Sequence, residues 1–178
     1  MKPDAPREDP WSTAKALARA TPECCEFFES PPVRTVLTPA YRLAVLDLND
    51  PRIAAGHAAS LRALSELKAL LEISGASLLV VLIPTKETVF ADPAEEASPV
   101  RKRLIAMEAR VWRDTKKSLN REGIAFADAL PELRKALAEG RSPYPEGTDG
   151  HPNADGHAAI AAAASTAVKA GRHPSPEP

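Results

Sequence analysis

A continuous apolar run, from Leu78 to Pro84, is the feature that most restricts the fold of this chain. Its length, its β-branched content and its terminal proline favour a strand that is buried on both faces. Such a strand is typical of a parallel sheet, in which helices cover both faces. The run is also far shorter than the roughly 20 apolar residues that cross a membrane as a helix. It therefore predicts an α/β domain.

Helices are predicted on both sides of this strand. Asp50 is a suitable N-cap with Pro51 at the first helical position, and leucines then recur at helical spacing until Gly75. A second amphipathic helix is expected over residues 98–123. Because this helix connects the apolar run to a short apolar segment at residues 124–127, the two segments should form a right-handed βαβ unit with parallel strands.

The remaining elements are shorter or less regular. A helix is expected near residues 12–20, a short one near 131–138, and a last one over 154–170, where an alanine-rich run strongly favours helix. Only two convincing parallel strands result, whereas doubly wound domains usually have about five or six. We therefore expect a three-layer α/β/α arrangement with an incomplete sheet.

Charge and cysteine content argue against several classes of function. The chain carries 23 lysines and arginines against 24 aspartates and glutamates, which gives no reason to expect a nucleic-acid or anionic-membrane partner. Aromatic residues are too scarce for a platform that stacks single-stranded nucleic acid. Cys24 and Cys25 are adjacent, which provides no Cys-x-x-Cys pair for zinc or redox chemistry, so two buried or idle thiols are expected. The start MKPDAPREDP lacks a hydrophobic signal region, so the chain as written should be soluble and cytoplasmic.

The residues suited to catalysis are concentrated in the loop before the last helix. In open α/β sheets, ligands and catalytic groups gather in loops at the carboxyl ends of strands. An imidazole accepts the proton of a serine hydroxyl only if a carboxylate on its other nitrogen holds its tautomer and orientation. Asp149 and His151 are the candidate carboxylate and base. Beside them, Asn153 can cap the last helix, and Gly156 lets that helix pack closely.

The run Asp-x-His-Pro-Asn-x-x-Gly-His, from Asp149 to His157, resembles the C-terminal block of SGNH (GDSL) hydrolases. The common form of that block places Asp three residues before His, where this chain has Thr148. The shorter spacing is similar to that of the branch related to alginate O-acetyltransferases. The segments LLVVLIPTKETVFAD and DALPELRKALAEGRSPYPEGTDGHPNADGH also resemble that branch, so that the similarity covers residues 34–171.

This resemblance implies both a fold and an activity. Residues 34–171 would be the C-terminal part of a three-layer α/β/α, flavodoxin-like SGNH domain, after an irregular segment at 1–33 and before a disordered tail at 172–178. The activity would be that of a serine esterase or O-acyltransferase acting on an acylated saccharide or a similar ester. In that reaction His151 deprotonates a serine, Asp149 orients the imidazole, and no cofactor is required. Since relatives of this kind are often exported or membrane-anchored, the localisation stays open.

The nucleophile block of that family is missing from the sequence. The family begins with a strand followed by Gly-Asp-Ser, which supplies the nucleophile and one oxyanion donor, and no Gly-Asp-Ser or Gly-x-Ser-x-Gly occurs here. Leu48-Asn49-Asp50 is similar to the second oxyanion block but lacks its glycine, so we interpret Asn49 and Asp50 as a helix cap. The chain is therefore expected to be a truncated hydrolase that is inactive alone. The alternative is a non-catalytic module, either degenerate or docked to a partner chain that supplies the serine block.

Several other polar residues have interpretations simpler than chemistry. His157 is expected to be a packed or capping histidine, and the basic run 101–103 to lie on a solvated helix face. Lys86 follows the strand in a turn that the family resemblance places near the site, but a solvated loop lysine is the simpler interpretation. Four potential metal ligands lie close in sequence: Asp149, His151, Asp155 and His157. Because the two histidines lack the i, i+4 spacing of a helical metal site, no metal is predicted.

Overall fold

The structure is a computed structural model that describes residues 10–21, 24–91 and 97–171. The predicted disordered tail at 172–178 lies outside the described residues, as do 1–9 and 22–23 of the predicted irregular segment. In chain order the elements are α1 (Pro10–Ala20), β1 (Glu26–Ser30), β2 (Val33–Leu37), α2 (Pro39–Leu46), α3 (Pro51–Ile73), β3 (Leu79–Leu82), α4 (Lys86–Val89), α5 (Pro99–Arg121), β4 (Ala125–Asp128), α6 (Leu130–Ala138) and α7 (Ala154–Gly171).

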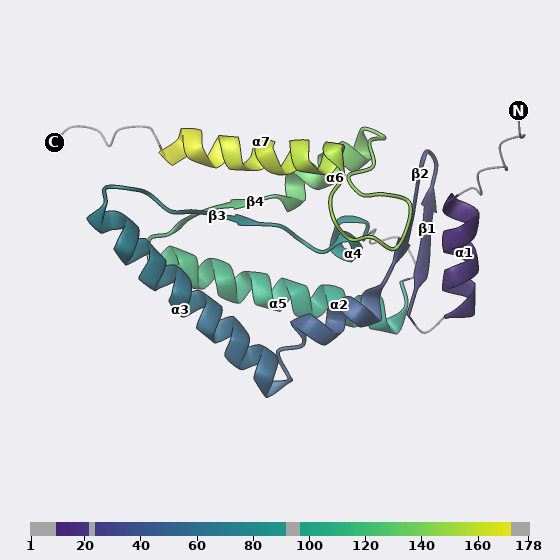
Figure 1. Cartoon of the computed structure of the whole chain (residues 1–178), viewed down its shortest axis with the longest axis horizontal. Coiled ribbons are helices and arrows are strands. Elements are labelled where there is room, and N and C mark those ends of the chain that lie inside the picture. The colour runs from purple at the N-terminus through teal and green to yellow at the C-terminus, as the bar shows by residue number, and fades with distance from the viewer. Residues whose placement is uncertain (1–9, 22–23, 92–96, 172–178) are drawn as a thin grey trace, which may run out of the picture.

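A small parallel sheet between two layers of helices forms the centre of the molecule (Figure 1). β3 and β4 pair in parallel, with Leu79 opposite Ala125 and Leu82 opposite Asp128. Helix α7 packs on one side of this sheet, and α5, with α3 beyond it, lies on the other. The predicted α/β class and the βαβ unit through α5 are thereby confirmed.

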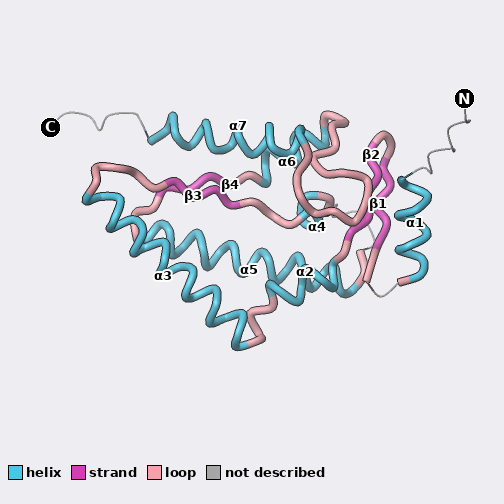
Figure 2. The backbone as a smooth tube through the Cα atoms, in the orientation of Figure 1, coloured by secondary structure: helices cyan, strands magenta, loops and turns pink. Residues whose placement is uncertain are grey.

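A second sheet, which was not predicted, lies next to helix α1, at one end of the molecule (Figure 2). β1 and β2 form an antiparallel hairpin, and α1 packs against it. Trp11 and Val36 are buried between the helix and the hairpin. The hairpin crosses the boundary predicted at residue 33, and Val33 and Leu37 of its second strand are buried in the main core. Part of the segment expected to be irregular is therefore ordered structure that contributes to that core.

The ends of the long helices agree with their sequence signals. The Asp50 carboxylate accepts a hydrogen bond from the backbone N–H of Arg52 at 2.8 Å, which confirms the predicted cap of α3. Ser98 caps α5 in the same way. Gly75 and Gly123 follow these helices with φ values of 72° and 64°, a left-handed conformation that favours glycine. Among the residues that the structure describes, no helix is both long enough and apolar enough to cross a membrane.

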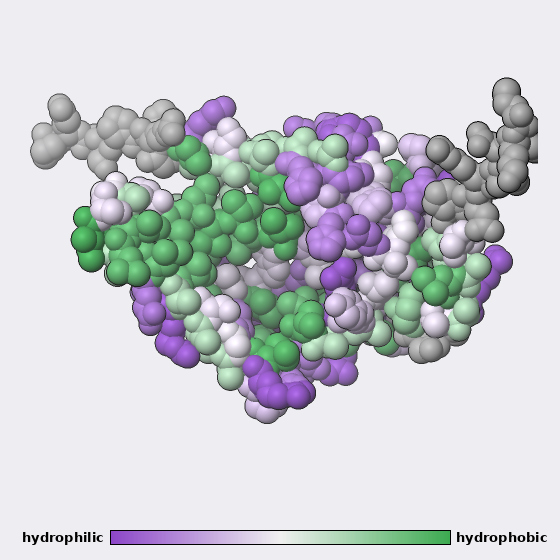
Figure 3. Space-filling view, viewed as in Figure 1, coloured by the Kyte–Doolittle hydropathy of each residue, from purple (hydrophilic) through white to green (hydrophobic). Residues whose placement is uncertain are grey.

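The prediction that the apolar strand is buried on both faces is wrong. All four residues of β3 are only half-buried, and Ile83 just beyond them is 50% exposed. Helix α3 contributes no buried residue, and its last residue, Ile73, is 85% exposed. Figure 3 shows the resulting apolar surface at the end of the molecule that β3 and the end of α3 occupy. The physical reason is that, within the described ranges, β3 pairs with β4 alone and α3 packs mainly on α5.

The prediction of a solvated face for the whole basic run is also wrong. Lys102 and Arg103 are exposed, but Arg101 is only 1% exposed. Its Nε atom lies 3.7 Å from the Glu26 carboxylate, and Ser98 also hydrogen-bonds that carboxylate. The start of α5 therefore packs against an acidic residue of β1, which compensates the charge of Arg101.

The two adjacent cysteines do not carry free thiols. Cys24 and Cys25 are joined to each other in a disulfide. Cys25 is buried in the small cluster between α1 and the hairpin, and Cys24 packs against that cluster. The expectation of two thiols is therefore wrong, although Cys25 is buried as one of the two alternatives predicted. The pair belongs to the packing of the N-terminal end of the structure.

Candidate functional site

The loop between α6 and α7 carries the predicted catalytic pair. It lies between α4 and the β1–β2 hairpin (Figure 1), at the end of β3 from which the chain enters α4. Tyr144 anchors the start of this loop, because its side chain is buried and its hydroxyl donates to the carbonyl of Pro84 at 3.4 Å. The loop is therefore at the carboxyl end of a sheet strand, where catalytic groups gather in α/β folds.

Asp149 and His151 are in direct contact. Asp149 Oδ1 accepts a hydrogen bond from the ring Nδ1 of His151 at 2.6 Å and another from its backbone N–H at 2.9 Å. The backbone bond, followed by the ring bond, lowers the pKa of the Asp149 carboxyl below its ordinary value. With Nδ1 bound to the carboxylate, Nε2 of His151 is the nitrogen that can accept a proton. The His151 side chain is 92% exposed, so another molecule can reach that atom.

Lys86 is buried next to the backbone of Asp149, so the prediction of a solvated loop lysine is wrong. Its side chain is 2% exposed, and its Nζ atom donates hydrogen bonds to the carbonyls of Gly147 at 2.7 Å and Asp149 at 2.9 Å. Burial lowers the pKa of Lys86 to about 8, although the nearby carboxylates of Glu87 and Asp149 oppose that shift. The reason for the error is α4, a four-residue helix capped by Thr85 that begins at the lysine itself.

Glu108 on α5 holds α4 in place. Its carboxylate accepts the backbone N–H of Thr85 at 2.7 Å and the Thr85 hydroxyl at 2.6 Å. The same carboxylate accepts the hydroxyl of Thr88. Glu108 is itself buried, which costs free energy of solvation, and three donors from one turn of the chain offset that cost. The position of α4, and with it the position of Lys86, depends on this contact.

The hairpin supports the loop from the other side. Thr35 on β2 is fully buried, and its hydroxyl donates to the carbonyl of Pro145 at 2.7 Å. Arg34 forms an ion pair with Glu146 at 3.1 Å. The sequence contains no signal for these contacts, because the hairpin residues are more than a hundred positions away from the loop and show no regular pattern.

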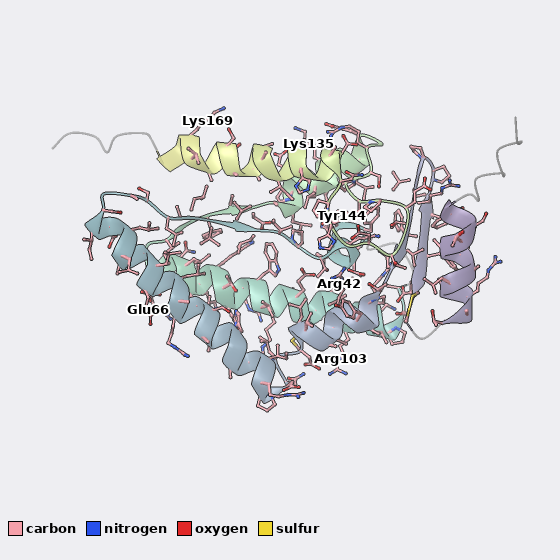
Figure 4. All side chains as sticks on the ribbon, viewed as in Figure 1. Arg42, Glu66, Arg103, Lys135, Tyr144 and Lys169 are labelled. Carbon is pink, nitrogen blue, oxygen red and sulfur yellow. A yellow bond between two sulfur atoms is a disulfide. The ribbon has the colours of Figure 1, made fainter. Side chains whose placement is uncertain are left out.

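Arg42 on α2 packs on the backbone between the two paired residues. A Cβ atom placed on Gly150 would lie 1.8 Å from Nη2 of Arg42, so a side chain at this position would displace the guanidinium. Figure 4 shows Arg42, which comes from α2, and Tyr144, which belongs to the loop. The charge of Arg42 also contributes to lowering the pKa of Lys86. Two cations, from α2 and α4, therefore lie close to the backbone around Asp149.

Asn153 and Gly156 have the structural roles that the sequence predicts. Asn153 Oδ1 accepts the backbone N–H of Gly156 at 3.1 Å, and its Nδ2 donates to the carbonyl of Ser142 at 2.8 Å. A Cβ atom on Gly156 would lie 2.3 Å from the carbonyl oxygen of Pro143. The start of α7 is thus fixed tightly against the beginning of the loop.

Gly156→Ala is expected to lower the free energy of unfolding by about 1 to 3 kcal/mol, because the new methyl group overlaps a backbone atom that cannot move alone. The matched control is Gly56→Ala on α3, where a Cβ meets nothing within 4 Å. That substitution should raise stability by up to about 1 kcal/mol through helix propensity. Urea unfolding followed by circular dichroism measures both values, and a stabilised Gly156→Ala protein would contradict the close packing.

The other candidate residues of this region do not join the pair. His157 lies in the first turn of α7, where its backbone N–H donates to the carbonyl of Asn153, which agrees with a residue of the capping region. Its side chain is exposed, so the alternative of a packed histidine is wrong. Asp155 lies 3.7 Å from Arg141 in an ion pair. Within the described ranges, no group of three or more histidine, cysteine, aspartate or glutamate side chains is arranged to hold a metal ion.

Comparison with known protein families identifies a matching family model. Residues 44–177 match the SGNH hydrolase-like domain of acetyltransferase AlgX. The comparisons with curated proteins and with solved structures give no match. The matched range contains the parallel sheet, Lys86 and the loop that carries Asp149 and His151. Because this range covers well over half of the chain, the chain belongs to the family of SGNH hydrolase-like domains of the AlgX acetyltransferase type.

Proposed function

We propose that this chain supplies the acid–base part of an acyl-transfer centre. His151 acts as the general base and Asp149 orients it. The observation that supports this proposal is the 2.6 Å contact between Asp149 Oδ1 and His151 Nδ1, which assigns the proton to Nδ1 and leaves Nε2 free to act. Since the pKa of Asp149 is lowered, its carboxylate stays ionised until the pH falls through that lowered value.

The reaction would be a two-step acyl transfer. His151 Nε2 takes the proton of a serine hydroxyl as the serine oxygen attacks the ester carbonyl. The tetrahedral intermediate collapses to an acyl-enzyme, and the protonated His151 returns its proton to the departing alkoxide. Water or a sugar hydroxyl, deprotonated by the same imidazole, then attacks the acyl-enzyme. As the second tetrahedral intermediate collapses, the imidazolium returns that proton to the serine oxygen and the serine is released. The result is hydrolysis in the first case and O-acyl transfer in the second.

The serine would come from a polypeptide segment outside this sequence. The chain contains no Gly-Asp-Ser block, and the exposure of the His151 side chain leaves its ring accessible to such a segment. An acylated saccharide is the proposed substrate class, in agreement with the acetyltransferase family that the chain belongs to. None of these steps requires a cofactor.

A second candidate function is a non-catalytic docking module. It is supported by the apolar surface at β3 and the end of α3, which includes Ile73 and Ile83. Exposed apolar patches and unpaired strand edges both favour association with another chain. In this case the Asp149–His151 pair would be a remnant without turnover.

The isolated chain is expected to release acetate from an O-acetylated oligosaccharide no faster than an equal concentration of its His151→Ala variant. The reason is that an unactivated ester requires the serine nucleophile, which the proposal places on another segment, whereas an activated aryl ester would be attacked directly by an exposed imidazole. Acetate release is the measurement. If the wild-type chain turns over and His151→Ala does not, the nucleophile lies within this sequence, and the proposal of an external serine is wrong.

A further inference from the structure

We propose that Lys86 is a positioning residue that holds the Asp149–His151 pair in its reactive geometry. This inference deepens the proposed function and rests on it. The starting observation is that one ammonium group binds two carbonyls of the loop, those of Gly147 and Asp149, at 2.7 and 2.9 Å. The second of these carbonyls belongs to the residue whose carboxylate binds the imidazole.

The loop needs contacts of this kind because its backbone forms no regular hydrogen-bonded structure that would fix its conformation. Residues 145–153 form no helix or strand, and Asp149 stands between the glycines at 147 and 150 with only Thr148 intervening. Glycine permits many backbone conformations, so a carboxylate carried on this segment has no fixed direction unless other contacts impose it. Lys86 fixes the carbonyls of the peptide groups that follow Gly147 and Asp149, and thereby limits the orientations that the Asp149 side chain can adopt.

Burial disfavours the charged form of Lys86, and the carboxylates that face it partly compensate for this. The charged groups that face it are the carboxylates of Glu87 and Asp149 and the guanidinium of Arg42. Lys86 in turn contributes to the lowered pKa of Asp149, so its charge helps to keep the carboxylate that binds His151 ionised. A buried ammonium costs free energy of solvation. The two carbonyl bonds and the facing carboxylates offset that cost only while the loop is in place.

The backbone at Lys86 is held firmly by its neighbours, which fixes the point from which the side chain extends. Thr85 caps α4 immediately before the lysine, and Glu108 of α5 binds Thr85 through both its N–H and its hydroxyl. Through these contacts α5, one of the long helices that pack on the sheet, fixes the position of the ammonium group. The pair on the exposed loop is therefore positioned by the packed part of the domain.

The test compares Lys86→Met with Lys135→Met in the isolated chain. Methionine keeps the unbranched shape of the side chain, one atom shorter, but removes all donors, and Lys135 is an exposed lysine on α6 (Figure 4). The measurement is the long-range ¹H–¹⁵N spectrum of the imidazoles, which separates Nδ1-protonated from Nε2-protonated rings. Wild type and Lys135→Met should show His151 protonated on Nδ1, and Lys86→Met should show a mixture of both tautomers.

The pH dependence gives a readout that a purely structural role would not change. In wild type the share of the Nδ1-protonated form should fall as the pH rises through about 8, where Lys86 loses its charge. In Lys86→Met this step should be absent. In an assembly that contains the serine, Lys86→Met should lower kcat by about 10²-fold with KM little changed, since a misplaced base costs rate rather than binding.

The outcomes separate this inference from the proposed function. If folded Lys86→Met has the wild-type tautomer and the wild-type pH response, Lys86 does not position the pair. If Lys86→Met changes the tautomer but His151→Ala leaves acyl transfer intact in the assembly, the positioning role stands and the catalytic role of the pair is wrong. Should Lys86→Met fail to fold, Lys86→Gln, which keeps a neutral donor, replaces it and is expected to show an intermediate tautomer ratio.

Discussion

His151→Ala is expected to lower acyl transfer by about 10³- to 10⁴-fold in the native assembly, obtained from the source cells through a tag on this chain. The substitution removes the only group that the proposal assigns to both proton transfers. Asp149→Asn should cause a loss of similar size, because an amide on Nδ1 no longer fixes the tautomer of the ring. Release of acetate from an O-acetylated oligosaccharide, or its transfer to an acceptor sugar, is the measurement.

His157→Ala is the matched control for this experiment. His157 lies six positions further along the chain and is exposed on the first turn of α7, so its loss removes an imidazole without touching the pair. The acyl-transfer activity of the His157→Ala assembly should equal that of wild type. If His151→Ala and His157→Ala are equally active, the pair does not catalyse the reaction. An assembly with no transferase or esterase activity at all would favour the docking module instead.

Glu108→Ala is expected to lower the free energy of unfolding by about 3 kcal/mol. The substitution leaves the backbone N–H of Thr85 and the hydroxyls of Thr85 and Thr88 without their acceptor in a part-buried place. Each unsatisfied buried donor costs about 1 to 3 kcal/mol, partly relieved when water enters the space. The midpoint and slope of urea unfolding give the change directly.

Glu66→Ala on α3 is the control for the loss of a glutamate from a long helix. Glu66 is exposed, and its substitution should change stability by no more than about 0.5 kcal/mol (Figure 4). Equal stability of the two variants would show that Glu108 does not anchor α4. Because Lys86 is carried by α4, Glu108→Ala should also produce part of the tautomer mixture expected for Lys86→Met.

The features that the sequence predicted correctly depend on short-range interactions. Helices α3 and α5 follow from their proline starts, their caps and the glycines that end them, all of which act within a few residues. The contact between Asp149 and His151 is of the same kind, since two residues separated by one glycine can meet without help from the rest of the fold. The parallel pairing of β3 with β4 follows from an apolar run on each side of a helix.

The features that the sequence missed depend on residues far apart in the chain. Lys86 is buried by loop carbonyls more than sixty positions away, Arg101 faces Glu26, and Thr35 supports the loop from β2. The same limit explains the exposed apolar face. Hydrophobicity identifies the residues that burial would stabilise, but whether they are buried depends on which neighbours the fold brings to them. The sequence alone therefore determined the long helices, the parallel strand pair and the local Asp149–His151 pair. The tertiary structure decided which polar side chains support that pair and which apolar side chains stay exposed.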